Sequence, residues 1–89
     1  MVRVHLKIYG QVQGVFFRQS AKLEAERNGI VGWVKNLGDG SVEIMAQGDK
    51  KLVDQFIKWC RGGPPFAQIE KVDIHWEKDL HDFDEFSVF

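Results

Sequence analysis

Cysteine is nearly absent from this sequence, and its scarcity restricts the possible folds. Cys60 is the only cysteine among 89 residues, so no internal disulfide and no CxxC metal or redox pair can form. Disulfide-stabilised miniproteins and zinc ribbons are therefore excluded. The three histidines are scattered without HxxxH spacing, and we expect no metal site.

Long hydrophobic runs are absent as well. No segment approaches the length of a membrane span, and the first ten residues alternate apolar and polar side chains instead of forming the apolar core of a signal peptide. We therefore expect a cytoplasmic protein that does not bind membranes.

An excess of charge of one sign is also lacking, since the net charge is -1. Long nucleic acids select a broad basic surface, so a nucleic-acid partner is disfavoured. The charge is uneven, because residues 1–36 carry six basic and two acidic side chains and residues 37–89 carry six basic and eleven acidic ones. The first part is the better place for a small anion, although both parts could also be ordinary solvated surfaces.

The sequence does contain enough apolar material for a folded core. Hydrophobic residues make up 44% and aromatic residues 12%, which predicts one domain over residues 1–89. A chain of this size buries only about 60–65% of its unfolded surface, so any functional site should be shallow. No sustained heptad or obvious apolar patch is visible, and we expect a monomer.

The first part of the chain predicts a strand followed by a helix. Apolar and polar residues alternate from residue 2 to Gly10, which is the period of a half-buried strand. Helical spacing follows over residues 18–28, and Gly29 is placed to close that helix. The predicted stripe of the helix consists of Phe17, Ala21, Ala25 and Asn28, with Leu23 and Arg27 beside it.

The rest of the chain predicts a hairpin, a second helix and two more strands. Strands at residues 30–37 and 42–46 flank a glycine-rich turn. Asp49 can cap a helix that Gly62 and Gly63 end, and Leu52, Val53, Phe56, Ile57 and Cys60 share its apolar face. A fourth strand covers residues 72–76, with either a bulge or a late strand start near Glu70 because Ile69 is out of phase, and a short strand ends the chain at residues 86–88.

This order, β-α-β-β-α-β plus a terminal strand, predicts an α+β fold. It is the split βαβ sandwich of the ferredoxin-like type, with two helices on one face of a mainly antiparallel sheet. Enzymes, sensors, metal carriers and RNA-binding modules all use this architecture, so the fold alone does not decide the function.

The segment between the first strand and the first helix has the features of a phosphate-binding loop. Residues 10–18 contain two glycines and lead into a helix whose first amides have no internal partner, and Arg18 adds a planar fork that matches phosphate oxygens. An ordinary strand-to-helix turn with a surface arginine fits equally well. Neither the Walker sequence nor the GxGxxG spacing of a dinucleotide fold is present.

Asn36 is the second candidate residue. It lies at the end of the second predicted strand, where asparagine commonly helps to form a turn. By residue type alone, the turn is the simpler interpretation.

Two motifs resemble those of the acylphosphatase family. They are G-x-V-Q-G-V-x-F-R at residues 10–18 and G-W-V-x-N-x-x-D-G-x-V-E at residues 32–43, and both match without a gap. The resemblance implies a hydrolase that cleaves the carboxyl-phosphate bond of a small acyl phosphate, without metal or organic cofactor. Inorganic phosphate or sulfate would be a product-like ligand.

The resemblance also implies roles for particular residues. Arg18 would bind the phosphoryl group together with loop amides, and Asn36 would position the attacking water. The implied phosphate-binding set is Gln13, Gly14, Val15, Phe16, Phe17 and Arg18. The chemistry is consistent with so few groups, because a carboxylate leaves as a weak base with a conjugate-acid pKa of about 4 and needs no protein general acid.

Other tempting residues have simpler interpretations. Cys60 precedes Arg61, but the phosphate loop of cysteine phosphatases needs an arginine further downstream, so we expect Cys60 to pack in the core. Ser20 has no neighbouring base in the sequence and is expected to act in capping or hydrogen bonding. The third strand lacks the aromatic pair of RNA-recognition sheets. A non-catalytic anion sensor and an RNA-binding module remain as alternatives to the enzyme.

Overall fold

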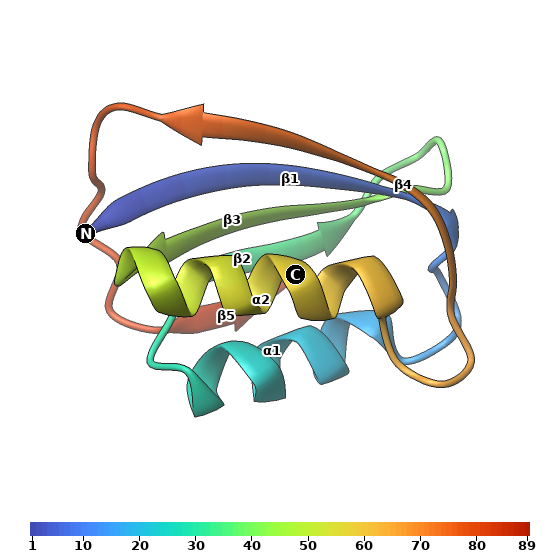
Figure 1. The fold of residues 1–89 in the computed structure, drawn as a ribbon. Helices are drawn as coiled ribbons and strands as arrows, with labels where there is room; N and C mark the ends of the chain where they lie inside the picture. Colours follow the sequence, from blue (N-terminus) through green and yellow to red (C-terminus); the bar gives the residue numbers. More distant parts are fainter.

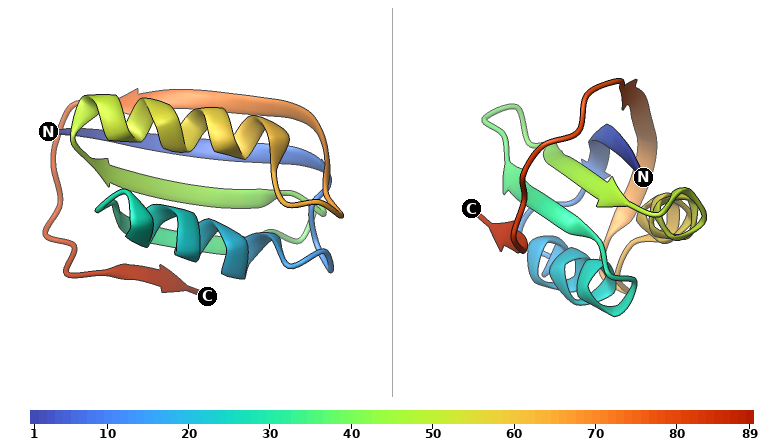
Figure 2. Two further views of the ribbon diagram at one scale, coloured as in Figure 1. Left: turned by 60° about the horizontal axis from the view of Figure 1, so that its bottom comes forward. Right: turned by 90° about the vertical axis from the view of Figure 1, so that its left-hand side faces the viewer.

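The computed structural model describes all residues 1–89 and consists of one five-stranded sheet with two helices. Along the chain, the elements are β1 (Val2–Gln11), α1 (Phe17–Arg27), β2 (Val31–Asn36), β3 (Val42–Gly48), α2 (Lys50–Gly62), β4 (Gln68–Glu77) and β5 (Phe86–Val88). This order confirms the predicted split βαβ arrangement. Both helices lie on the same face of the sheet (Figures 1 and 2).

The strand order across the sheet is β4-β1-β3-β2-β5. Neighbouring strands run antiparallel except β5, which pairs in parallel with β2 at the sheet edge. Because β2 ends beside the turn into α1, and β5 runs along β2, the ends of both strands reach the segment that precedes α1 (Figure 2).

The predicted alternation of β1 is confirmed. Val4, Leu6 and Ile8 are fully buried against the helices, and the strand continues one residue past the expected end at Gly10. Gly10 has a φ of 128°, and a Cβ atom there would collide with the backbone oxygen of Gln68. Of the two alternatives expected near Glu70, the bulge is present and the late strand start is not: β4 already begins at Gln68, and its pairing shifts at this point and leaves Glu70 without a partner on β1.

The two helices bury most of the stripes that the sequence predicts, although Asn28 at the end of α1 is only half-buried. In α1, which begins one residue earlier than expected, the buried residues are Phe17, Ala21 and Ala25. In α2 they are Val53, Phe56, Ile57 and Cys60, whereas Leu52 is only half-buried. Asp49 caps α2 by accepting a hydrogen bond from the Lys51 amide at 3.0 Å. Neither helix is long and apolar enough to cross a membrane.

The outer face of the sheet is polar and carries ion pairs between strands. His5 on β1 contacts Glu43 on β3 at 2.7 Å, and Lys35 on β2 contacts the same carboxylate at 3.4 Å. Burial would raise the pKa of Glu43, but the hydrogen bonds from His5 and Lys35 outweigh it and lower that pKa. His5 therefore has a structural partner, as expected for a polar strand position.

Candidate active site

The backbone that enters α1 presents a row of amides without protein partners. The helix starts after Phe16 with no side-chain cap, and its first turn contains no acidic residue. None of the amides of residues 12–19 donates a hydrogen bond to another protein group; the first that does is Ser20, which bonds the Phe16 oxygen at 3.1 Å. Unpaired amides at a helix N-terminus, where the helix dipole is positive, form an anion-binding site.

The loop curves because two of its residues adopt left-handed backbone conformations. Gly14 has a φ of 75° and Phe16 a φ of 63°, and Phe16 is the only non-glycine residue with a positive φ. Such residues turn successive N–H groups towards one side of the chain, which is the geometry of an anion-binding nest. A Cβ atom at Gly14 would meet nothing within 4 Å, so glycine is needed there for its backbone angle alone.

Gln13 ties this loop to the β2–β3 hairpin. Its side-chain Nε2 donates hydrogen bonds to the backbone oxygens of Leu37 at 2.7 Å and Ser41 at 2.9 Å. The side chain therefore points to the hairpin, while the Gln13 backbone amide remains unpaired. Because Leu37 directly follows Asn36, this contact fixes the loop relative to the asparagine.

A hydrogen bond and an ion pair of Asp39 stabilise the turn of the β2–β3 hairpin close to Asn36. The Asp39 carboxylate accepts a hydrogen bond from the Ser41 amide at 3.0 Å and contacts Lys7 Nζ at 3.0 Å. Hydrogen bonds from the Ser41 side chain and amide, and then from Lys7, hold the pKa of Asp39 far below its usual range. Asp39 is therefore ionised at neutral pH, where these contacts stabilise the turn after β2.

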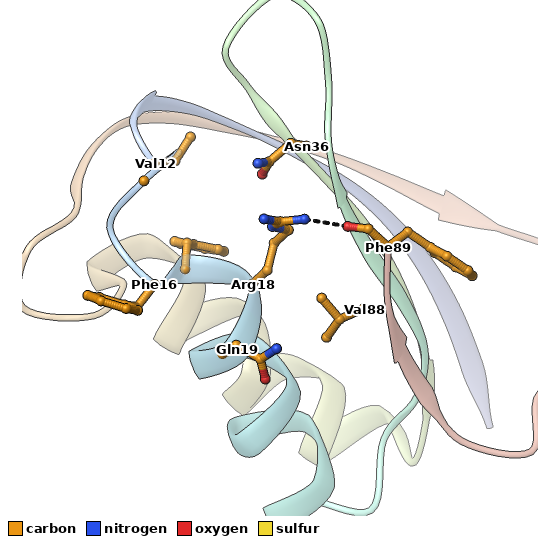
Figure 3. A pocket seen from close by; sticks show the side chains of 9 residues that line it. Val12, Phe16, Arg18, Gln19, Asn36, Val88 and Phe89 are labelled. Atoms are coloured by element: carbon orange, nitrogen blue, oxygen red, sulfur yellow. Dashed lines mark hydrogen bonds between the residues drawn. The ribbon is translucent and has the colours of Figure 1, made fainter.

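Arg18 and Asn36 point into the same cavity (Figure 3). One nitrogen of Arg18, Nη1, donates a hydrogen bond to the backbone oxygen of Phe89 at 2.6 Å, which orients the guanidinium. The Oδ1 atom of Asn36 is buried and has no hydrogen-bond partner. An unpaired buried acceptor costs stability, and functional sites are where such atoms are retained.

The cavity has a volume of about 380 Å³, more than a phosphoryl group alone would fill. Three parts of the chain form it: the loop with the start of α1, the end of β2 and the end of β5. Its lining consists of Val12, Gly14, Phe16, Phe17, Arg18, Gln19, Asn36, Val88 and Phe89. Arg18 is the only charged residue among them.

Most of the residues predicted for the site line this cavity. Gly14, Phe16, Phe17, Arg18 and Asn36 do so, whereas Gln13 and Val15 belong to the same loop without lining it. The predicted set did not include four lining residues: Val12, Gln19, Val88 and Phe89. The apolar tail indicated only a short strand, and nothing in it signalled that a backbone oxygen reaches Arg18.

The thiol of Cys60 is shielded from solvent. Cys60 is fully buried in the core, and burial raises the pKa of its thiol. It therefore acts in packing, as expected. No group of three or more His, Cys, Asp or Glu side chains is placed to hold a metal ion.

Comparison with known proteins identifies the family. The model of the family described as Acylphosphatase matches residues 4–88. The chain belongs to the acylphosphatase family. The acylphosphatase of Pyrobaculum arsenaticum is 48% identical, with 99% of this chain and 94% of that protein covered. The acylphosphatase of Methylococcus capsulatus is 46% identical, with 99% and 96% covered.

Solved structures of acylphosphatases agree with this assignment. The crystal structure of the Bacillus subtilis acylphosphatase superimposes with a TM-score of 0.97 at 32% identity, covering 100% of this chain and 99% of that one. The Coxiella burnetii acylphosphatase gives a TM-score of 0.94 at 36% identity, with 99% and 92% covered. Membership of the acylphosphatase family carries with it the hydrolysis of acyl phosphates.

Proposed function

We propose that Arg18 and the amides of residues 13–18 bind the phosphoryl group, and that Asn36 orients the water that attacks it. The observation that carries this proposal is that three kinds of polar group come together at one cavity. The loop that carries the unpaired amides, the Arg18 side chain and Asn36, whose Oδ1 is buried and unpaired, all contribute to the lining of one cavity. Together they supply donors for a phosphoryl group and an acceptor for water.

Arg18 is suited to hold phosphate oxygens because only part of its guanidinium is occupied. Nη1 is bound to the Phe89 oxygen, and no other hydrogen bond of this side chain is formed within the protein. The remaining N–H groups can donate to two phosphoryl oxygens, and each charge-assisted bond contributes about 1.5–3 kcal/mol. The loop amides donate to the third oxygen and share the developing negative charge.

Asn36 supplies what the attacking water needs. Its unpaired Oδ1 accepts a hydrogen bond from the water, and this contact turns a lone pair of the water oxygen towards phosphorus. A carboxamide is too weak a base to deprotonate water, so the proton passes to a phosphoryl oxygen. The new bond joins the water oxygen to phosphorus, the bond from phosphorus to the acyl oxygen breaks, and the products are a carboxylate and inorganic phosphate.

This chemistry requires no further catalytic group. The leaving carboxylate needs no proton, and positioning with electrostatic stabilisation is sufficient for a loose phosphoryl-transfer transition state. Arg18 and the helix N-terminus supply positive charge where a metal ion acts in other phosphatases, so we propose metal-independent catalysis. All groups come from one chain, which is consistent with a functional monomer.

Substitution of Arg18 tests the proposal. Arg18→Gln should reduce the hydrolysis of benzoyl phosphate by about 10³-fold or more, and Arg18→Lys should restore only part of it because the fork is lost. Arg27→Gln, at the exposed end of the same helix, is the matched control and should leave the rate unchanged. The assays contain EDTA.

Two outcomes would contradict the proposal. Wild-type turnover by Arg18→Gln would remove Arg18 from the mechanism. Tight phosphate binding by the wild type without any turnover of acyl phosphate would make the protein an anion sensor.

A further inference from the structure

The long strand β4 has a free edge. It pairs only with β1 and lies at one side of the sheet, where Figure 1 shows no further element beyond it. From Lys71 to Glu77 its register with β1 is unbroken, because the bulge lies before this segment. No backbone hydrogen bond outside the β1 ladder involves these residues. Every second residue of the segment therefore presents an N–H and a C=O group that can pair with another strand.

The polar side chains of this segment are complementary to those of a second copy. Lys71, Asp73, His75 and Glu77 lie on the outer face of the sheet, opposite the outer-face residues of β1. An antiparallel second copy that pairs about Ile74 places each lysine opposite the glutamate of the other chain and each aspartate opposite the histidine. Side chains directly opposite each other in such a pair have Cβ atoms about 4.5–5.5 Å apart, within reach of an ion pair.

The neighbouring registers lack this complementarity. Pairing about Asp73 brings the two copies of that carboxylate together, and pairing about His75 places Asp73 opposite Glu77. Like charges directly opposite each other are destabilising. Charged side chains commonly protect an edge strand from pairing, but charges of a single sign would do so more effectively than this self-complementary set.

The helix-facing side of the same segment supplies apolar surface. The Trp76 side chain is 43% exposed, and Val72 and Ile74 are only half-buried. In the register about Ile74, each tryptophan lies opposite the valine of the other chain and the two isoleucines meet. Contacts between aromatic and β-branched side chains across strands are favourable, so this register covers apolar surface with apolar surface.

We propose that the protein forms a twofold-symmetric dimer through the free edge of β4, in which the two sheets join into one. The expectation of a monomer rested on the lack of a heptad and of an apolar patch, and a strand edge consists of backbone groups that neither pattern marks. The cavity lies by β2 and β5, at the other side of the sheet, so each active site remains complete within one chain. The inference is therefore independent of the proposed function.

Sedimentation equilibrium tests this dimer. The paired segment is short and buries less than a standard interface, so we expect a weak dimer with a Kd on the order of 100 µM. Lys71→Glu and Glu77→Lys each replace two attractive contacts by two repulsive ones and should raise the Kd by about tenfold or more. An equal mixture of the two variants should associate about as tightly as the wild type, because both contacts then join opposite charges again.

The matched control is Arg27→Glu, which makes the same charge reversal as Lys71→Glu. Arg27 lies at the end of α1, and this helix packs against β2 and β5 rather than β4. The Kd of Arg27→Glu should equal that of the wild type. All three variants should hydrolyse benzoyl phosphate at the wild-type rate per chain, which shows that they are folded.

Two results would overturn the proposal. A wild type that is monomeric up to about 1 mM would leave a different protein as the only occupant of this edge. A dimer that neither Lys71→Glu nor Glu77→Lys weakens, or a mixture of these variants that does not associate, would place the contact at another surface. Acyl-phosphate hydrolysis would stand in each case, whereas full activity of Arg18→Gln would overturn the proposed function and leave the dimer intact.

Discussion

Replacing Asn36 with alanine separates its two interpretations, because a turn residue and a water-orienting residue respond in opposite directions. The Asn36 Oδ1 atom is buried without a partner. An unsatisfied buried acceptor costs about 1–3 kcal/mol, and Asn36→Ala removes that cost together with some packing. We therefore expect the free energy of unfolding to stay unchanged or to rise by up to about 1 kcal/mol. If Asn36 instead served to form the turn, its replacement would lower the free energy of unfolding by about 0.5–1 kcal/mol.

Activity should change much more than stability. Without the oxygen that orients water, turnover should fall by about 10²-fold or more, because a misplaced nucleophile costs at least that much. Binding of inorganic phosphate should persist, since Arg18 and the loop amides are untouched. Urea denaturation gives the stability, benzoyl phosphate hydrolysis the rate, and calorimetry the phosphate affinity.

Asn28 provides the matched control. Its side chain donates to the Glu24 backbone oxygen at 2.8 Å and so has a structural partner at the end of α1. Asn28→Ala should lower stability by about 1 kcal/mol and retain full turnover. The reasoning fails if Asn36→Ala behaves like Asn28→Ala, with stability reduced and activity kept.

Three further predictions concern the surroundings of the site. Gln13→Leu should lower kcat/KM by about tenfold or more, because two hydrogen bonds of about 1 kcal/mol each no longer hold the loop against the hairpin; an unchanged rate would show that the tether is dispensable. Cys60 should react with iodoacetamide only after denaturation, since its thiol is buried and its pKa raised, and rapid alkylation of the native protein would refute that placement. Asp39 has a lowered pKa, so its stabilising effect is present above pH 4 and is lost as the pH falls towards the folded-state value. Asp39→Asn should therefore have a lower free energy of unfolding than the wild type at pH 7, and this difference should narrow below pH 4. A difference that does not depend on pH would contradict this assignment.

Local patterns in the sequence predict the elements well, because each pattern reports burial on one face. The alternation of Val4, Leu6 and Ile8 and the stripe of Phe17, Ala21 and Ala25 both reappear as buried residues. The out-of-phase Ile69 indicated an irregularity near Glu70, and the structure shows that it is a bulge. These features depend on residues close together in the chain, where spacing carries the information.

Contacts across the fold could not be predicted in the same way. Arg18 meets the oxygen of Phe89 across 71 positions in the chain, and Gln13 reaches the hairpin across 24 and 28. Both contacts depend on the strand order, which places β5 beside β2, and on backbone oxygens that no residue type marks. The two motifs predicted residues that the structure brings together in one cavity, but the contact that orients Arg18 and the part of the lining that comes from the chain end required the structure.

The most direct test of the phosphate cradle is an amide NMR titration of the wild type with inorganic phosphate. The account predicts that the largest shifts fall on the unpaired amides of residues 13–18 and on the Arg18 side chain, and that Arg18→Gln weakens the response at the same amides. Shifts centred at another part of the protein, such as the start of α2, in a protein that still hydrolyses acyl phosphates, would contradict it.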